Sequence, residues 1–205
     1  MRADKLLHQL GFFESRKKAQ VAIEKNLVAL RRGGQDRAIK KVSEEIEPRP
    51  DDEWIIAEDA EFKYVSRAGL KLEGALEHFK KSVQGLVCLD IGLSTGGFAD
   101  CLLSRGARFV LGIDVGRDQV HPRLRGEARL VSLEKFNARN PLPEDAMAQL
   151  PEGRRDFDLV VVDVSFISLL KVLVPQLPLL KKGGEVVALV KPQFEAGPGQ
   201  LNKKG

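Results

Sequence analysis

The chain has 205 residues, of which 43% are hydrophobic, so it is long enough for one large or two small domains with a packed core. No segment contains the roughly 18 unbroken apolar residues that a membrane helix needs. The first residues also lack the apolar core of a secretory signal. Cys88 and Cys101 have no metal-type spacing, and we expect both to be reduced thiols in the core. These features argue against a membrane or secreted protein and predict a soluble, cytoplasmic one without a bound metal.

The charge is unevenly distributed along the chain, although the formal net charge is only +4. Residues 1–41 contain eleven Lys and Arg against four acids, a balance of +7, whereas residues 42–61 contain nine acids against Arg49 alone, a balance of −8. Pro48 and Pro50 lie in this acidic stretch, as is typical of a linker. We therefore predict a small basic domain with its linker over residues 1–60 and a second domain over residues 61–205.

The small domain should begin with two short helices and a strand. Leu6, Leu7 and Leu10 predict the buried side of the first helix, and Ser15 is suited to cap the second. The second helix should bury Ala19, Ala22 and Ile23, and the strand "LVAL" follows at 27–30. The basic residues in the first turn of the second helix oppose the helix dipole, unless an anion such as a phosphate binds at that end. A merely solvated basic face is the alternative.

The stretch "RADKLLHQLGFFESRKKAQVAIEKNLV" resembles the small RNA-binding domain named after ribosomal small-subunit protein four. The resemblance covers about residues 1–45 and implies a small α+β domain that binds structured RNA. The contacts that it implies are Arg2, Lys5, Arg16, Lys17, Lys18, Arg31 and Arg32.

The second domain should alternate helices and strands. A helix is expected in "YVSRAGLKLEGALEHFKKSVQG" (64–85), with Leu72, Ala75, Leu76 and Phe79 on one side. Because the strands that follow are apolar on both faces, they predict a parallel sheet covered by helices, a doubly wound Rossmann-like α/β fold. We expect strands at 86–91, 109–115, 129–133, 158–164 and 185–191, and helices at 97–105 and around 168–180.

Charged side chains stand where these strands end. In doubly wound sheets, ligands bind beyond the carboxyl ends of the strands. Five charged residues at that edge therefore predict a site rather than chance. They are Asp90, Asp114, Glu134, Asp163 and Lys191. We further expect the strands that precede Asp163 and Lys191 to be neighbours in the sheet.

The turn after the first of these strands reads "DIGLSTGGF" rather than the G-x-G-x-x-G of dinucleotide-binding folds. An acid at this position would repel a pyrophosphate, but it suits a cofactor that carries an ammonium group. Asp114, at the end of the next strand, can accept both ribose hydroxyls of a nucleoside. The pattern favours S-adenosylmethionine. NAD, or a glycine turn that only permits close packing, are the alternatives.

The motifs "YVSRAGLKLEGAL", "LDIGLSTGGFAD", "LGIDVG", "LEKFNARN", "DLVVVDVSFISL" and "LVKPQFEAG" resemble the TlyA (haemolysin A-like) family. These proteins are ribosomal RNA 2′-O-methyltransferases with an FtsJ-type catalytic domain. The resemblance implies a catalytic set that includes Lys71, Asp163 and Lys191. Arg67 is one helical turn from Lys71, so both can point at the same spot, and it is a candidate RNA contact. The cofactor pocket that it implies consists of Asp90, Gly92, Ser94, Thr95, Gly96, Gly97, Phe98, Asp114, Glu134 and Asn137.

Methylation of a 2′-hydroxyl requires alignment of the reactants and removal of one proton. Lys191 is the candidate base or orienting group, Lys71 the neighbouring cation, and Asp163 the acid that positions them. The family continues beyond "GQLNKKG" with further strands that carry a catalytic Glu, so we expect this sheet to lack its last strands.

The leading hypothesis is an enzyme that uses S-adenosylmethionine to methylate ribosomal RNA, with ribosomal RNA or ribosomal subunits as its partner. A ribosome-assembly protein with an inactive methyltransferase-like domain is one alternative. A membrane-lytic haemolysin is another, and the lack of a spanning or strongly amphipathic basic segment argues against it.

Overall fold

The computed structural model describes residues 1–13, 15–57 and 63–196. It divides into two compact units, Met1–Ala60 and Glu61–Gly205, which are described separately below. Within the described residues, no helix is both long and apolar enough to cross a membrane.

The N-terminal unit has two helices and a three-stranded antiparallel sheet in the order β2-β1-β3. Its elements are α1 (Ala3–Gln9), α2 (Arg16–Glu24), β1 (Val28–Arg32), β2 (Gln35–Ala38) and β3 (Glu53–Ile56). As predicted, the Ser15 side chain accepts a hydrogen bond from the Lys18 N–H at 3.2 Å and caps α2. The prediction for Leu10 was wrong: α1 ends one residue earlier, and Leu10 is 50% exposed.

The second unit is built on a five-stranded parallel sheet in the order β6-β5-β4-β7-β8, which confirms the predicted α/β fold. The chain starts in the centre with β4, moves outward through β5 and β6, and returns to place β7 on the other side of β4. The strands are β4 (Val87–Ile91), β5 (Phe109–Ile113), β6 (Leu130–Leu133), β7 (Phe157–Val162) and β8 (Leu180–Ala188). The reversal of direction between β4 and β7 is the switch point at which such sheets bind ligands.

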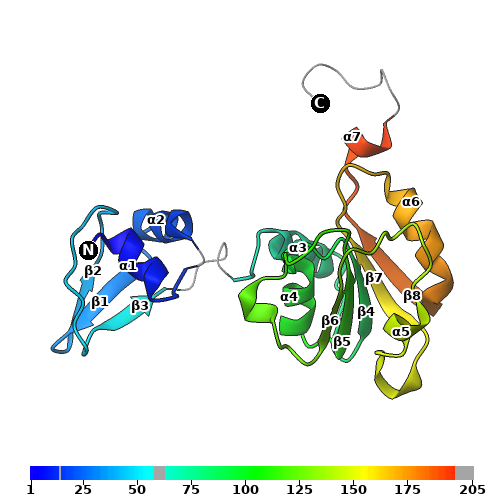
Figure 1. The fold of residues 1–205 in the computed structure, drawn as a ribbon, viewed down its shortest axis with the longest axis horizontal. Helices are drawn as coiled ribbons and strands as arrows, with labels where there is room; N and C mark the ends of the chain where they lie inside the picture. The colour runs from blue at the N-terminus through cyan, green and yellow to red at the C-terminus, as the bar shows by residue number, and fades with distance from the viewer. Residues whose placement is uncertain (14, 58–62, 197–205) are drawn as a thin grey trace. The chain divides into compact units, whose positions relative to one another are not determined.

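Helices cover both faces of this sheet (Figure 1). The α-helices are α3 (Ala68–His78), α4 (Gly97–Ser104), α5 (Glu144–Met147), α6 (Leu169–Leu173) and α7 (Pro192–Glu195), and the 3₁₀ helices are η2 (Pro122–Leu124), η3 (Pro151–Gly153) and η4 (Val174–Leu179). On one face Leu72 of α3 and Leu102 of α4 pack against strand residues such as Cys88. On the other face Met147 of α5 and Val172 of α6 pack against strand residues such as Leu89. Cys88 and Cys101 are free and buried, as expected.

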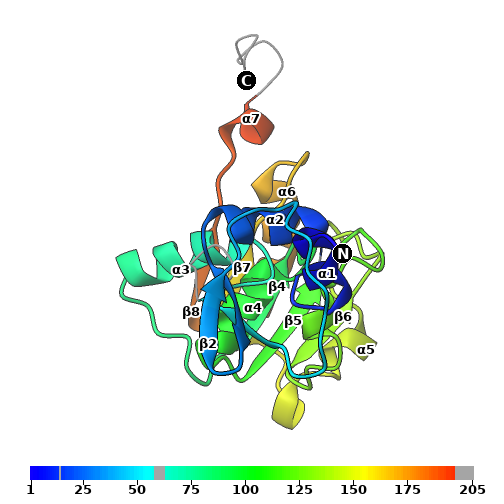
Figure 2. The same cartoon turned by 90° about the vertical axis from the view of Figure 1, so that its left-hand side faces the viewer.

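Three predicted elements differ from those observed. The helix expected over 64–85 occupies only Ala68–His78, and Phe79, expected to face inward, is 67% exposed just after its end. The helix expected around 168–180 consists of the short α6 followed by η4, because Pro175 and Pro178 cannot donate helical hydrogen bonds. The last strand ends at Ala188. Lys191 therefore lies beyond β8, at the start of α7, and Figure 2 shows α7 beyond the end of that strand.

Candidate active site

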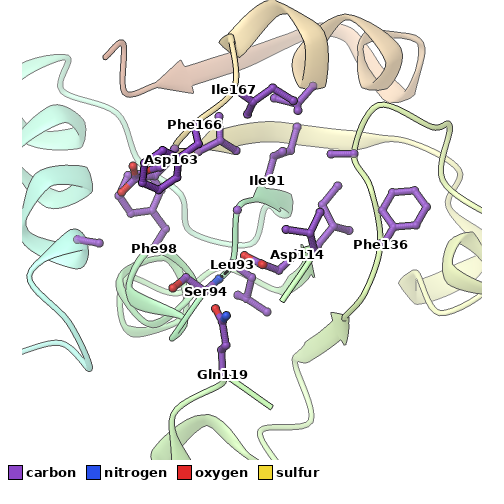
Figure 3. Close-up of a pocket in the computed structure, with 18 of the residues that line it drawn as sticks. Ile91, Leu93, Ser94, Phe98, Asp114, Gln119, Phe136, Asp163, Phe166 and Ile167 are labelled. Carbon is purple, nitrogen blue, oxygen red and sulfur yellow. Dashed lines mark hydrogen bonds between the residues drawn. The ribbon is translucent and has the colours of Figure 1, made fainter. Parts of the chain in front are cut away.

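A cavity of about 590 Å³ opens at the carboxyl ends of the central strands, where the switch point predicts a site. The turn after β4, the end of β5 and the segments after β7 and β8 all contribute to its walls. Figure 3 shows Ser94 and Asp114 together in one part of this cavity, and Asp163 and Phe166 in another. Of the predicted site residues, Gly92, Ser94, Thr95, Gly97, Phe98, Asp114, Asn137, Asp163 and Lys191 line it.

The glycine turn needs glycine for steric reasons. Gly92 has φ +92°, and a Cβ atom there would lie 2.6 Å from the Asp163 carbonyl oxygen. At Gly97, the first residue of α4, a Cβ atom would lie 2.1 Å from Ser66 Oγ. The glycines thus let the turn approach both the end of β7 and the segment before α3, which brings bare backbone up to the cavity.

Asp114 joins the end of β5 to this turn. Its Oδ2 accepts a hydrogen bond from the Ser94 N–H at 2.8 Å, and its Oδ1 accepts one from the Gly116 N–H at 2.7 Å. Asn137 lines the same cavity, and its Oδ1 accepts from the Arg139 N–H at 3.1 Å. Both side chains still have unused lone pairs that a ligand's hydroxyl groups can occupy.

Asp90 is fully buried at the end of β4, between the two halves of the sheet. Burial raises the pKa of its carboxyl group to about 8, the nearby Ala99 N–H dipole opposes this rise, and the charges of Asp163 and Asp114 add to it. Asp90 is not part of the cavity wall, although Ile91 and Gly92 beside it are. Any effect of Asp90 on a ligand in the cavity would therefore be electrostatic and act across the turn.

Lys191 and Asp163 form an ion pair, with Nζ 2.6 Å from Oδ1. Both side chains are largely buried, at 19% and 13% exposure. The strands that precede them, β7 and β8, are hydrogen-bonded neighbours, as predicted. Lys191 Nζ also donates a hydrogen bond to Ser165 Oγ at 2.8 Å. The cavity thus has a lysine amine held by two oxygen atoms.

Sequence reasoning missed two residues in this part of the cavity wall, Ser165 and Phe166. Phe166 is 91% exposed, has φ +65°, and packs against Phe194 of α7 with ring centroids 5.2 Å apart. A bulky residue with positive φ is a strained conformation that the surrounding structure must hold in place. The signal was present in the motif "DVSFISL", where a serine and an aromatic residue follow Asp163 directly.

Besides Asp90, four predicted site residues of the second unit do not line the cavity. Arg67 and Lys71 are exposed at the start of α3, although Ser66 and Ala68 beside them do line it. Glu134 accepts a hydrogen bond from the Asp118 N–H at 2.9 Å. Gly96 is the N-cap of α4 and lies against Leu124. Among the described residues, no group of three or more His, Cys, Asp or Glu side chains is arranged to hold a metal ion.

In the N-terminal unit, the described contacts pair four of the seven arginines and lysines predicted to bind RNA with acids. The fully buried Asp4 is the partner of Arg2, at 3.2 Å, and of Arg16, at 2.8 Å, and it also accepts a hydrogen bond from Gln20. Burial raises the pKa of Asp4, but the hydrogen bonds from Gln20 and Arg16 outweigh it and hold the pKa at about 2. Arg31 pairs with Asp36 and Glu53, and Arg32 pairs with Asp52. Lys5 and Lys17 are exposed.

Comparison with known proteins places the second unit in a family. Residues 64–205 match the model of FtsJ-like methyltransferases. Hemolysin A of Brachyspira hyodysenteriae is 40% identical over 205 residues, which are all of this chain and 80% of that protein. The 16S/23S rRNA (cytidine-2′-O)-methyltransferase TlyA of Mycobacterium tuberculosis is 45% identical over 150 residues, which are 73% of this chain and 53% of that protein.

Comparison with solved structures also finds relatives that are named hemolysins. A candidate hemolysin from Streptococcus thermophilus is 40% identical, with a TM-score of 0.64 over 98% of this chain and 70% of that chain. The similarity therefore extends over both units in sequence and in fold.

Proposed function

This chain belongs to the FtsJ-like methyltransferase family, and we propose that it transfers a methyl group from S-adenosylmethionine to a ribose 2′-hydroxyl of ribosomal RNA. The observation that carries the proposal is the Lys191–Asp163 pair in the same cavity as the glycine turn. Relatives with sequence identities of 40–45% include a named rRNA 2′-O-methyltransferase, which supports this substrate. With ribosomal RNA as its substrate, the protein is proposed to act in the cytoplasm.

The residues around the cavity fit S-adenosylmethionine, which supplies a methyl group on a positively charged sulfonium when it is bound. The turn from Gly92 to Phe98 would lie along its amino-acid part, and Asp114 would accept its ribose hydroxyls, with Asn137 nearby. Two features support this fit. The carboxylates at the strand ends suit a cation, and Asp90 is a buried acid that a positive charge would stabilise in its ionised form.

Lys191 would act on the hydroxyl group of the RNA. A sugar hydroxyl is a weak nucleophile at neutral pH, so removal of its proton by a nearby amine favours the transfer. Asp163 would hold the amine in place, and the largely buried position of both side chains strengthens their interaction. Lys71 would be an additional cation, on the strength of the motif "SRAGLK".

RNA binding is assigned to the exposed basic residues of both units. In the N-terminal unit Lys5 and Lys17 are the foremost candidates, because Arg2, Arg16, Arg31 and Arg32 pair with acids. Arg67 would contact RNA near the cavity. Phe166 offers an exposed ring beside Asp163, and an aromatic face of this kind can stack on a base.

The test is single-turnover transfer of labelled methyl groups to ribosomal RNA by the parent protein, Lys191→Ala and Lys191→Arg. We expect both variants to lose about 10²–10⁴-fold in rate, because neither can accept the proton. Affinity for S-adenosylmethionine should change little. Lys182→Ala, at an exposed lysine of β8, is the matched control and should keep the parental rate. Parental rates in both Lys191 variants would contradict the proposed role of Lys191.

A further inference from the structure

Ser165 forms the second polar contact of the Lys191 amine. Its Oγ accepts a hydrogen bond from Nζ at 2.8 Å, while Asp163 Oδ1 lies 2.6 Å from the same nitrogen. Ser165 lines the cavity and is exposed, whereas the lysine side chain is 19% exposed. The amine is therefore held between a buried acid and an exposed hydroxyl group.

The number of hydrogens on the Lys191 amine determines where its lone pair can point. An ammonium group has three N–H donors, whereas the neutral amine that acts as a base has two N–H donors and one lone pair. If Asp163 and Ser165 take both hydrogens of the neutral amine, the lone pair is left in the one remaining tetrahedral direction. Because Lys191 lines the cavity, that direction is available to a hydroxyl group bound there.

We propose that Ser165 is a positioning residue that, together with Asp163, aims the lone pair of Lys191 at the hydroxyl group to be methylated. This inference rests on the proposed function and adds a residue to it. With Asp163 alone, the amine could rotate about the Cε–Nζ bond and present either a hydrogen or the lone pair to the substrate. A second acceptor removes that freedom.

The segment that carries Ser165 is fixed at several points, so its hydroxyl group is held in position. Phe166 packs against Phe194, and further along the segment Glu195 accepts hydrogen bonds from the Ser168 hydroxyl and the Leu169 N–H, both at 2.7 Å. These contacts join the segment after β7 to α7, the helix that begins next to Lys191. The donor and the acceptor of the Lys191–Ser165 hydrogen bond thus belong to two segments that are tied together.

The proton balance is simple. The substrate oxygen would form a bond to the transferred methyl group as the methyl–sulfur bond breaks and the sulfur leaves as a neutral thioether. The O–H bond breaks and its proton passes to Nζ, and the resulting ammonium keeps its ion pair with Asp163 and its hydrogen bond to Ser165. The ammonium returns one proton to solvent before the next turnover. Ser165 neither gains nor loses a proton overall.

The experiment measures single-turnover methyl transfer at saturating S-adenosylmethionine and ribosomal RNA for the parent, Ser165→Ala and Ser165→Thr. We expect Ser165→Ala to lower the rate constant about tenfold, the effect of one lost hydrogen bond to a reacting group. Affinity for S-adenosylmethionine and for RNA should stay at the parental value. Ser165→Thr keeps a hydroxyl group and should recover most of the rate. Ser132→Ala, which removes an exposed hydroxyl from β6, is the matched control.

A second measurement does not depend on activity. In the protein without cofactor, acetic anhydride should acetylate Lys191 faster in Ser165→Ala than in the parent, relative to Lys182 in the same sample. If the parent transfers no methyl group, the proposed function fails, and the acetylation rates alone decide whether Ser165 restrains the amine. If the parent is active, a full transfer rate in Ser165→Ala would overturn the positioning role. A rate loss explained by weaker cofactor binding would also overturn it.

Discussion

Replacement of the buried Asp90 by Asn should stabilise the protein in the absence of a ligand. The folded structure holds this carboxyl group in its protonated, neutral form, because burial raises its pKa from 3.8 to about 8. Asn has nearly the same shape as the protonated acid, but it carries no proton that can be lost. In the parent, the carboxyl group of Asp90 ionises readily in the unfolded chain but not in the folded protein, which favours unfolding. The substitution removes this ionisation.

The direction and size of the effect follow from linkage. Between about pH 4 and pH 8 the folded state binds more protons at this site than the unfolded state, so the stability of the parent falls as pH rises. Each pH unit contributes about 1.4 kcal/mol, which gives an upper limit of about 4 kcal/mol at pH 7. Local relaxation and water penetration reduce this limit, and we expect Asp90→Asn to gain about 2 kcal/mol at pH 7.

Urea unfolding followed by far-UV circular dichroism between pH 5 and pH 8.5 measures this effect. Trp54, the single tryptophan, lies in β3 and reports the N-terminal unit separately. The control is Asp158→Asn in β7. Arg154 holds the pKa of Asp158 below its usual value, so this substitution should destabilise the fold at neutral pH. An Asp90→Asn variant whose advantage over the parent does not grow with pH would refute the reasoning.

Two further substitutions test the remaining contacts. Asp4→Asn should destabilise the N-terminal unit by about 1–2 kcal/mol at pH 7, because the carboxylate, with its pKa near 2, stabilises the fold above about pH 4 and loses this effect as pH falls toward 2. Trp54 fluorescence during urea unfolding measures it, and a variant as stable as the parent would contradict the role of the Arg2–Asp4–Arg16 cluster. Asp114→Ala should weaken binding of S-adenosylmethionine by about 1–3 kcal/mol in isothermal titration, since the ribose hydroxyls lose their acceptor. Unchanged affinity would remove Asp114 from the pocket.

Strand positions could be predicted from the sequence because the apolar runs are long and end in charged residues, whereas the full strand order was not predicted. The proximity of Asp163 and Lys191 followed from the same reasoning, since parallel neighbours bring their carboxyl ends together. The ends of helices could not be predicted as well. Leu10 and Phe79 continue an apolar pattern beyond the last turn of α1 and α3, where the chain leaves the core.

Contacts between side chains that are distant in the sequence could not be predicted from the sequence patterns. Asp4 lies in the first turn of α1, where an acid is ordinarily a solvated residue that favours the helix dipole. Its burial beneath Arg16 and Gln20 depends on how α2 packs on α1, so it could not be read from either helix alone. Ser165 is a similar case, because its importance depends on where the Lys191 side chain ends.

The charges around the cavity also favour S-adenosylmethionine over a dinucleotide as the cofactor that the glycine turn would hold. The carboxylates of Asp114 and Asp163 are close enough to Asp90 to raise its pKa further, so the protein's own side chains already concentrate negative charge at the site. A dinucleotide would add the two negative charges of its pyrophosphate to this group, and the repulsion would grow in the partly buried surroundings. A ligand with a sulfonium and an ammonium group does the opposite, because it offsets the carboxylates and lets Asp90 ionise. The buried acid that destabilises the free protein would then contribute to binding a positively charged cofactor.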